Sequence, residues 1–518
     1  MADKAQSCRI ATRLKEVELR RYQAVSIPPR LRRSLLDNLP VRMGRPSFHP
    51  AAVRPGIVHL GLGGFCRAHT ARYTHDLMNQ HGEALQWGII GTGLMPADRR
   101  MRDALVPQDA LYTLVERQDS LEQATVIGSL AGVLYAGEST AEVLEAIDNP
   151  AIRIVSLTVT ENGYCLNAAT KQLDSQHPLV AHDLAHPEQP RSAVGVIVEA
   201  YRRRRSRGLP PFTALTCDNI QHNGMVLQSA VLALARRRDP ALADWIDERA
   251  RFPKTMVDRI TPVTSPEMVN YLAQHYAVED QWPVFSESFK QWVIEDDFAG
   301  GRPQWEKVGA QFVSDVGPYE LMKLRLLNAS HLAIAGLGRL SGYQYIDVAL
   351  RDASLRAFMS ALMERETGPT LLPVPGIDLP AYKAQLLERF SNPHIKDTLE
   401  RVNNDAPVNY LIDPIRDRLS DARPAELLAL ALAGWMRRVR GEDEAGHPIK
   451  IVHPLAALLR SRAIEGGPDP LPLLSIGSLF GDLGLHRSFV ESVGKWLAML
   501  YESGATATLS QARRILSF

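Results

Sequence analysis

Residues 54–65 read Arg-Pro-Gly-Ile-Val-His-Leu-Gly-Leu-Gly-Gly-Phe, and this stretch decides the fold. A short apolar run from Ile57 to Leu60, bounded by glycine and proline, predicts a buried strand. Gly61 and Gly63 form a turn at the end of this strand. A helical pattern follows from Ala68 to about Gln80. A strand, a Gly-x-Gly turn and a helix in this order are typical of the start of a nucleotide-binding unit.

The glycine turn has the composition of a phosphate-binding loop. A turn without side chains can approach a pyrophosphate, and the helix N-terminus then offers free N–H groups and a partial positive charge. We therefore assign a cofactor site to this turn, formed by Gly61, Gly63, Gly64 and Phe65. The full G-x-G-x-x-G pattern is not met, because Cys66 occupies the third position. A plain tight turn is the alternative interpretation.

An acidic residue about 20 residues beyond such a turn commonly binds the ribose of the cofactor. The best candidate is Asp98, which follows the second predicted strand and lies farther along than that distance. Arg99 and Arg100 come directly after it and would suit a 2′-phosphate. These residues leave the choice between NAD and NADP open.

Further apolar runs of strand length lie at 87–93, 152–159 and 210–217, and helical patterns separate them at about 139–147, 191–206 and 224–238. Strands that alternate with helices favour a parallel sheet covered on both faces.

After about residue 315 the helical patterns dominate, at roughly 354–365, 379–391, 425–440, 450–464 and 487–503. We therefore predict an α/β protein in which a Rossmann-type parallel-sheet domain is followed by a mostly α-helical domain. The predicted division is an N-terminal arm at 1–50, a dinucleotide-binding domain at 51–315 and a helical substrate and catalytic domain at 316–518.

The composition is that of an ordinary globular protein. Of 518 residues 45% are apolar, and 59 Lys and Arg against 58 Asp and Glu give a formal net charge of +1. This balance gives no electrostatic case for nucleic acid as the main partner. The four cysteines include no C-x-x-C pair, which fits a reducing compartment and excludes a disulfide framework and the usual structural zinc patterns.

We expect a cytoplasmic protein that does not enter a membrane. Residues 1–21 carry both charges and no apolar core, unlike a secretory signal. The most apolar stretch, 427–436, is too short to span a bilayer.

Residues 319–331 place several polar side chains on an apolar helix. An α-helix turns by about 100° per residue. Four polar residues therefore fall on one side of the helix, within about 140° of its circumference: Glu320, Lys323, Asn328 and His331. Burial lowers the pKa of a lysine toward neutrality, as a general base requires, and asparagine amides can donate to a developing alkoxide. A satisfied polar network in the core is the alternative interpretation.

Tyr319 and Lys323 also form Y-x-x-x-K, the pair through which short-chain dehydrogenases transfer protons. About 260 residues separate this pair from the glycine turn, too many for a compact short-chain enzyme. We therefore expect Tyr319 to play no catalytic part.

Two further segments carry candidate site residues. Residues 217–224, CDNIQHNG, end a predicted strand, at the edge where open parallel sheets bind ligands. Residues 253–262, PKTMVDRITP, place Asp258 and Arg259 in a short apolar strand. An Asx-rich helix cap and a structural ion pair are the respective alternatives.

Six motifs occur in the order GIVHLGLGGFCRAH, TENGY, CDNIQHNG, MVDRITP, FKQWVIEDDF and YELMKLRLLNASH. Together they resemble the polyol-specific long-chain dehydrogenases, and most closely the mannitol 2-dehydrogenase branch. The similarity runs from about residue 50 to the C-terminus. It implies zinc-independent hydride transfer between NAD(H) and a small substrate. This reaction would interconvert a mannitol-like sugar alcohol and a fructose-like 2-ketose.

The resemblance also implies roles for individual residues. It implies that Lys323 is the general base, that Asn219 and Asn328 hold the reacting oxygen, and that His331 hydrogen-bonds the substrate and helps to place the lysine. Glu320 and Glu161 match carboxylates that link the buried lysine to solvent. Asp258 and Arg401 match contacts to substrate hydroxyls. No metal is expected, because a lysine and two amides supply the proton acceptor and the alkoxide donors.

One departure from the family bears on the substrate. After Arg401 the family usually has a Gly-Ser stretch and then a basic residue, whereas this chain has Asn409. Loss of that cation would remove a donor to distal hydroxyls and favours a substrate other than mannitol.

Two rival functions follow. The fructuronate and tagaturonate reductases share most of the motifs, so a hexuronate reductase is the second reading of the sequence. A catalytically silent NAD-binding sensor or scaffold is the third. The sequence leaves open whether the protein is a monomer or a small homo-oligomer.

Overall fold

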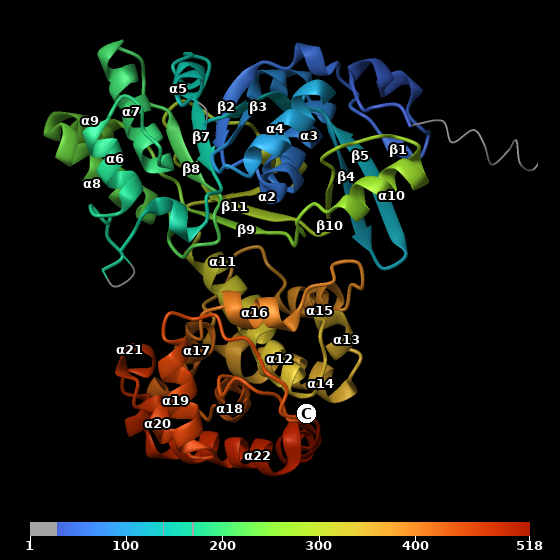
Figure 1. The fold of residues 1–518 in the computed structure, drawn as a ribbon, viewed down its shortest axis with the longest axis vertical. Helices are drawn as coiled ribbons and strands as arrows, with labels where there is room; N and C mark the ends of the chain where they lie inside the picture. The colour runs from blue at the N-terminus through green and yellow to red at the C-terminus, as the bar shows by residue number, and fades with distance from the viewer. Residues whose placement is uncertain (1–27, 138, 168–169) are drawn as a thin grey trace, which may run out of the picture.

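The computed structural model describes residues 28–137, 139–167 and 170–518. Strands and helices alternate up to residue 313, and every named element from residue 317 onward is helical (Figure 1). The predicted fold class, a Rossmann-type parallel sheet followed by a mostly helical part, is therefore confirmed. Of the predicted arm, residues 1–27 lie outside the described residues, and Arg33–Asn38 forms a short 3₁₀ helix. The division at 50 and 315 stays a prediction.

The central sheet has five parallel strands in the order β6-β3-β2-β7-β8. These strands are β2 (Pro55–Leu60), β3 (Gly88–Gly93), β6 (Leu130–Tyr135), β7 (Ile154–Leu157) and β8 (Thr213–Thr216). The strand order reverses between β2 and β7, so the carboxyl ends of these two strands open a crevice for a ligand.

Four of the five strands match the predicted apolar runs. The exception is the edge strand β6, which the sequence analysis did not assign although its residues Leu130–Tyr135 are apolar; only part of its side chains are buried.

Helices cover both faces of the central sheet, as the alternation of elements predicts. Val58 and Leu60 of β2 belong to one apolar core and Ile57 to the other, because successive strand side chains point to opposite faces. The first core is covered by α5 (Ala141–Ile147), α7 (Ala193–Ser206) and α8 (Asn223–Arg238), and the second by α3 (Thr70–Gln80) and α4 (Asp98–Leu105).

Two smaller sheets flank the central one, and the sequence patterns predicted only one of their strands, the one within residues 253–262. The first has the order β1-β5-β4-β10, formed by β1 (Met43–Gly44), β4 (Tyr112–Gln118), β5 (Leu121–Ile127) and β10 (Val284–Glu287). The second has the order β12-β11-β9, formed by β9 (Thr255–Asp258), β11 (Gln291–Glu295) and β12 (Gln311–Val313). The remaining helices of this part are α2 (Gly64–Ala68), α6 (Pro178–Ala185), α9 (Pro240–Arg249) and α10 (Pro266–Tyr276).

The side chain of Asn223 joins β9 to the end of β8. Its Nδ2 donates to the carbonyl oxygens of Asp218 and Thr255, at 3.0 and 2.9 Å, and its Oδ1 accepts the N–H of Thr255 at 3.0 Å. Asn223 is fully buried, and these bonds satisfy its amide. The predicted CDNIQHNG turn therefore fixes the position of the strand that carries Asp258.

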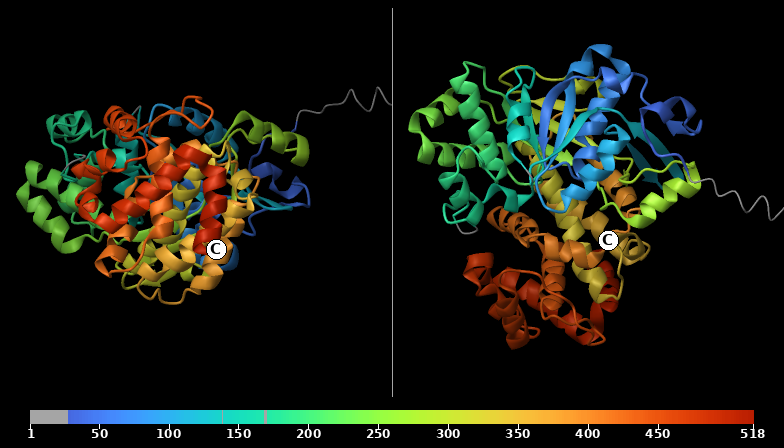
Figure 2. Two further views of the ribbon diagram at one scale, coloured as in Figure 1. Left: turned by 90° about the horizontal axis from the view of Figure 1, so that it is seen from below. Right: turned by 45° about the horizontal axis from the view of Figure 1, so that its top comes forward.

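The helical part lies below the sheets in Figure 1 and packs around α12. The longer helices are α11 (Gly317–Met322), α12 (Ala329–Leu340), α14 (Ala353–Leu362), α15 (Leu379–Phe390), α16 (Leu399–Asp405), α17 (Asn409–Ser420), α18 (Glu426–Arg438), α19 (Ala456–Gly466) and α22 (Arg487–Leu516). Short helices are α13 (Ile346–Ala349), α20 (Leu471–Leu474) and α21 (Gly477–Phe480). Figure 2 shows this part from two further directions. None of the helices in the described ranges is long and apolar enough to span a bilayer.

A π-helical segment, Lys323–Asn328, joins α11 to α12. The prediction of a uniform α-helix is therefore wrong over these residues. In an α-helix residues five apart point about 140° away from each other, whereas a π turn bonds residue i to i+5 and brings them closer to one face. Segments of this kind occur frequently at functional sites.

The first prediction concerns the glycine turn. Gly61 has φ +89°, and a Cβ there would lie 2.1 Å from the carbonyl oxygen of Thr158, whereas at Gly63 the nearest atom would be 3.9 Å away. We expect Gly61→Ala to lower the free energy of unfolding by at least about 2 kcal/mol, through strain and clash. Gly63→Ala, the matched control, should cost less than about 1 kcal/mol. Chemical denaturation measures both values, and equal losses would contradict this account of the turn.

Candidate active site

Two neighbouring cavities meet between the sheets and the helical part. Their volumes are about 1410 and 570 Å³. The larger extends along the glycine turn and the carboxyl edge of the central sheet, and the smaller lies toward α12 and α16. The residues that line both are Asn219, Asp258, Arg259, Thr261, Pro262, Val263, Lys323 and Tyr410.

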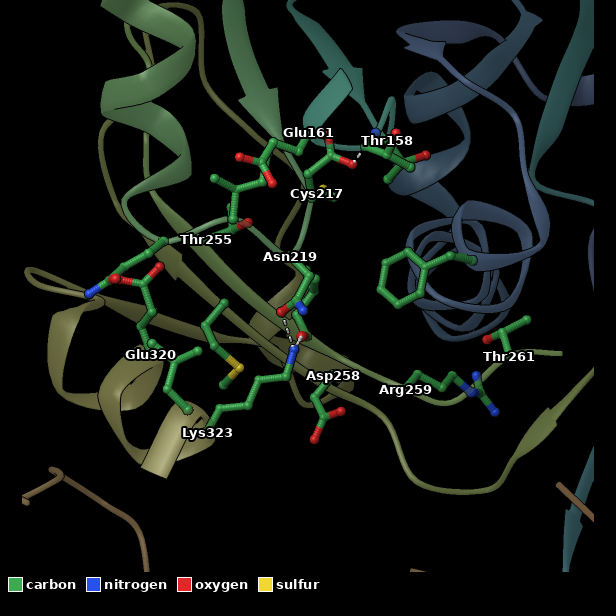
Figure 3. A pocket seen from close by; sticks show the side chains of 18 of the residues that line it. Thr158, Glu161, Cys217, Asn219, Thr255, Asp258, Arg259, Thr261, Glu320 and Lys323 are labelled. Carbon is green, nitrogen blue, oxygen red and sulfur yellow. Dashed lines mark hydrogen bonds between the residues drawn. The ribbon is translucent and has the colours of Figure 1, made fainter. Parts of the chain in front are cut away.

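Lys323 lies at the junction of the two cavities (Figure 3). Its Nζ donates to Asn219 Oδ1 at 2.6 Å and to the carbonyl oxygen of Val257 at 2.7 Å. A neutral amine has two N–H groups and one lone pair, so these two bonds leave the lone pair for a further partner. Because the Asn219 oxygen is already bound, its amide N–H groups remain as the donors that it can offer to a ligand.

The surroundings of Lys323 lower the pKa of its amine. Burial is the largest effect and lowers the pKa of Lys323, and the positive charge of Arg389 lowers it further. The carboxylates of Asp258 and Glu320 act in the opposite direction, and the net pKa lies below the ordinary lysine value. A lysine that loses its proton more readily is suited to general base catalysis.

Asp258 is bound at both carboxylate oxygens by Arg389 of α15. Nη1 donates to Oδ2 at 2.7 Å and Nη2 donates to Oδ1 at 3.0 Å. Burial alone would raise the pKa of Asp258, but the guanidinium outweighs it and holds the pKa below its usual value. Asp258 therefore takes part in a buried ion pair with Arg389, and its predicted contact to substrate hydroxyls stays a prediction.

His331 and Asn328 line the smaller cavity. The His331 ring stacks on Phe390 with centroids 4.4 Å apart, and its Nε2 lies 3.6 Å from Asp397 Oδ2. Burial lowers the pKa of His331 to about 4, so the ring is neutral near pH 7. Asn328 lies within hydrogen-bond reach of the Tyr410 hydroxyl.

The two candidate linking carboxylates lie on the larger cavity at different depths. Glu320 is largely buried, and its Oε1 accepts the N–H of His222 at 2.8 Å. Burial raises the pKa of Glu320 above its ordinary value. Glu161 is exposed and pairs with Lys171 at 3.1 Å. One carboxylate thus lies near Lys323 and the other near solvent, and their joint role stays a prediction.

The position of Glu161 depends on Asp218. The Asp218 carboxylate accepts the N–H groups of Val159 and Thr160, at 3.0 and 2.9 Å, and the hydroxyl of Tyr164 at 2.8 Å. It therefore holds the TENGY loop against the end of β8, next to Asn219.

Arg401 lies on the smaller cavity and is held by two aspartates. Its Nε donates to Asp397 Oδ1 at 2.6 Å, and its Nη1 donates to Asp405 Oδ2 at 3.1 Å. Asn409, the position where the family usually has a cation, lies on the larger cavity instead. The expectation that this position faces the distal substrate hydroxyls stays a prediction.

The predicted cofactor residues lie together at the larger cavity, which Gly63, Gly64, Phe65 and Asp98 line. Gly63 leaves open space there, as a close ligand requires. Gly61 is needed for another reason, since the Thr158 carbonyl oxygen occupies the place of its Cβ.

Asp98 uses one oxygen within the protein. Its Oδ2 accepts the N–H groups of Leu94 and Met95 at 2.9 and 2.8 Å and so shapes the turn after β3.

Tyr319 points away from the junction, because its hydroxyl donates to the carbonyl oxygen of Pro375 at 2.7 Å. It is not among the residues that line either cavity, in agreement with the expectation for the Y-x-x-x-K pair.

The sequence analysis missed Arg389, although one signal for it exists. Tyr382, Leu386, Arg389 and Phe390 are the buried residues of α15 and fall at helical spacing. An arginine within an apolar helical stripe requires a buried partner. This pattern could have identified Arg389 as a buried residue, but it does not show which carboxylate binds it.

A search of the described ranges for a metal site gives a negative result. Among residues 28–137, 139–167 and 170–518, no group of three or more His, Cys, Asp or Glu side chains is arranged to hold an ion.

The fold and the paired cavities define a Rossmann-type oxidoreductase. The model of the mannitol dehydrogenase Rossmann domain matches residues 55–307, and that of the mannitol dehydrogenase C-terminal domain matches residues 315–501. The chain belongs to the mannitol dehydrogenase family, as the six motifs indicated.

Relatives of different names match almost the whole chain. D-mannonate oxidoreductase of Escherichia coli is 44% identical over 477 residues, 90% of this chain and 97% of the relative. Mannitol dehydrogenase 2 of Saccharomyces cerevisiae is 41% identical over 494 residues, 94% of this chain and 97% of the relative. The solved ternary complex of Pseudomonas fluorescens mannitol 2-dehydrogenase with NAD and D-mannitol has a TM-score of 0.83 and 41% identity, and covers 94% of this chain and 99% of that one.

Proposed function

We propose that this protein is an NAD-dependent, zinc-independent dehydrogenase that interconverts a sugar alcohol and its 2-ketose, with Lys323 as the general base. The observation that carries the proposal is the amine of Lys323, held by Asn219 and Val257 at the junction of the two cavities. The Pseudomonas fluorescens relative was solved with NAD and D-mannitol, which supports the same pair of ligands here.

The larger cavity suits the cofactor. Gly63, Gly64 and Phe65 would hold the pyrophosphate, because the turn leaves open space and the first N–H groups of α2 start there. Asp98 would bind the ribose with the oxygen that does not hold the turn, and this favours NAD over NADP. NAD, when bound, accepts the hydride that leaves the substrate carbon.

The side chains of the smaller cavity suit a hydroxyl that loses its proton. The lone pair of Lys323 accepts the proton, while the amides of Asn219 and Asn328 donate to the oxygen as it becomes an alkoxide and then a carbonyl. The neutral ring of His331 exchanges a hydrogen bond with the substrate. Asp258 retains lone pairs that accept substrate hydroxyls. The proton then passes from Lys323 by way of Glu320 and Glu161 to water.

The second prediction tests the base. Lys323→Ala should lower kcat for polyol oxidation about 10²- to 10⁴-fold, the usual contribution of a general base, and leave the Kd for NAD nearly unchanged. Tyr319→Phe, four residues away, is the matched control and should change kcat less than about threefold, since its hydroxyl binds only the Pro375 carbonyl oxygen. Steady-state kinetics and NAD titration measure both. Loss of activity in the tyrosine variant alone would refute the assignment.

The third prediction concerns metal. Because a lysine and two amides supply the chemistry, we expect treatment with EDTA and dialysis to leave kcat unchanged. An activity that falls on chelation and returns with added Zn²⁺ would contradict the zinc-independent mechanism.

A hexuronate reductase with the same machinery is the second candidate, and the 44% identity to D-mannonate oxidoreductase favours it. Such a substrate carries a carboxylate, which needs a cation. Arg401 is already paired with Asp397 and Asp405, but Lys396 is exposed and lines the same cavity. Lys396 has φ +51°, an unusual conformation for lysine, in a loop that His394 anchors to Asp119 O.

The fourth prediction separates the two candidates. If the substrate is a uronate, Lys396→Asn should lower kcat/KM for fructuronate or tagaturonate at least about tenfold, since it removes a charged hydrogen bond. Asparagine tolerates φ above zero, and Lys396→Arg keeps the charge and serves as control. For fructose, kcat/KM should stay within about twofold. Turnover of mannitol and fructose but of neither uronate would exclude the second candidate, and binding of NAD without any turnover would favour the sensor.

A further inference from the structure

A buried arginine joins the two parts of the molecule next to Lys323. Arg389 of α15 lies between Asp258 at the end of β9 and Glu287 at the end of β10. Besides its two bonds to Asp258, its Nε donates to Glu287 Oε2 at 2.9 Å and its Nη2 donates to Oε1 at 2.8 Å. The Arg389 side chain is 2% exposed, and the ring of Phe289 covers its guanidinium at 3.9 Å.

The cluster determines which way the Asp258 carboxylate faces. The backbone of Val257 accepts a hydrogen bond from Lys323, so the next residue along the strand, Asp258, lies beside the amine (Figure 3). Both carboxylate oxygens bind Arg389. The bonds to Glu287, which also accepts the N–H of Ile260 at 2.7 Å, hold the guanidinium from the other side.

Glu287 shares the guanidinium with Asp258, and burial raises the pKa of Glu287 above its usual value. The remaining groups around the cluster add little net charge. Arg259, at the end of β9, is paired with Glu116 of β4. His69, next to α2, and His331 of α12 have pKa values that burial lowers to about 3 and about 4, so both rings are neutral near pH 7. Glu320 of α11 and the buried phenol of Tyr382 on α15 are the remaining titratable neighbours. Arg389 is therefore the cation that offsets part of the negative charge of Asp258. Without it, Lys323 would be the nearest cation to that carboxylate.

We propose that Arg389 is a positioning residue for proton transfer: it holds the Asp258 carboxylate and offsets part of its charge, so that the amine of Lys323 keeps its lone pair for the substrate. This inference rests on the proposed function. Without Arg389, the unpaired buried carboxylate would take the nearest cation, and Lys323 would remain a protonated partner of Asp258. The guanidinium suits this task because its planar fork binds two carboxylates at once.

The fifth prediction is a shift in the pH dependence of oxidation. A protonated Lys323 cannot accept the substrate proton, so activity is lost below the pKa of the amine. Arg389→Gln should raise that pKa, and the acid limb of kcat/KM should move upward by about one pH unit or more. Arg389→Lys keeps a cation but cannot bind both carboxylates, and its limb should lie between those of Arg389→Gln and wild type.

The double variant Asp258→Asn/Arg389→Gln removes the charge that Arg389 offsets. Its acid limb should return to near the wild-type position, even though its kcat is lower, which a general loss of structure would not produce.

Arg418→Gln is the matched control for destabilisation. Arg418 is also a buried arginine of the helical part, but it binds the carbonyl oxygens of Pro424 and Arg365, away from both cavities. Its substitution should lower Tm without moving the limb. If Arg389→Gln lowers kcat/KM equally at every pH, or if Arg418→Gln shifts the limb as far, Arg389 has only a structural role.

A measurement that needs no enzymatic turnover can test the role of Arg389 independently of the proposed function. Acetic anhydride modifies neutral amines, so mass spectrometry of Lys323 acetylation against pH reports the same titration in the protein alone. The midpoint should rise in Arg389→Gln, and an unchanged midpoint in that variant overturns the inference. A wild-type protein without turnover on polyols and uronates would instead refute the proposed function, whatever the acetylation shows.

Discussion

The site depends on one buried amine with two fixed acceptors. Lys323 Nζ reaches Asn219 Oδ1 and Val257 O from the helical part, while both acceptors belong to the strand-containing part. Hydrogen bonds of this length tolerate displacements of only a few tenths of an ångström, so the two parts must meet in one register. These contacts hold the amine at the position where the two cavities join. The two hydrogen bonds that position Lys323 thus also fix how the two parts of the molecule meet.

The strand-containing part is built to keep those acceptors in place. Asn223 holds β9 beside β8, Asp218 holds the TENGY loop, and Arg259 bonds to Glu287 O and pairs with Glu116. Each of these polar groups is buried and satisfied, and an unmatched change in any of them would leave a costly unpaired partner. Asp218 and Arg259 therefore hold the fold together at the same place where they line the cavities.

The sequence patterns predicted most of the parallel sheet and much of the site for local reasons. β2, β3, β7 and β8 are short runs with few charged residues and almost wholly buried side chains, because both of their faces are covered. Asn219 follows a strand and Lys323 lies among apolar helical residues, so each was visible as a polar residue in an apolar setting. The edge strand β6, the flanking strands other than β9 and the π segment were missed. The pairing of the flanking strands depends on neighbours distant in the sequence.

The amino-acid sequence alone determined the fold class, the family and the residue types available to the site, because strand and helix periodicity and the glycine turn are local properties of the chain. Only the tertiary structure decided which of those residues act on one another. Arg389 lies 131 residues from Asp258 and 102 from Glu287, and nothing in the local pattern of α15 names either carboxylate. The charge that Asp258 presents to Lys323 is therefore a property of the folded arrangement, since electrostatic interactions depend on distance in space and on burial.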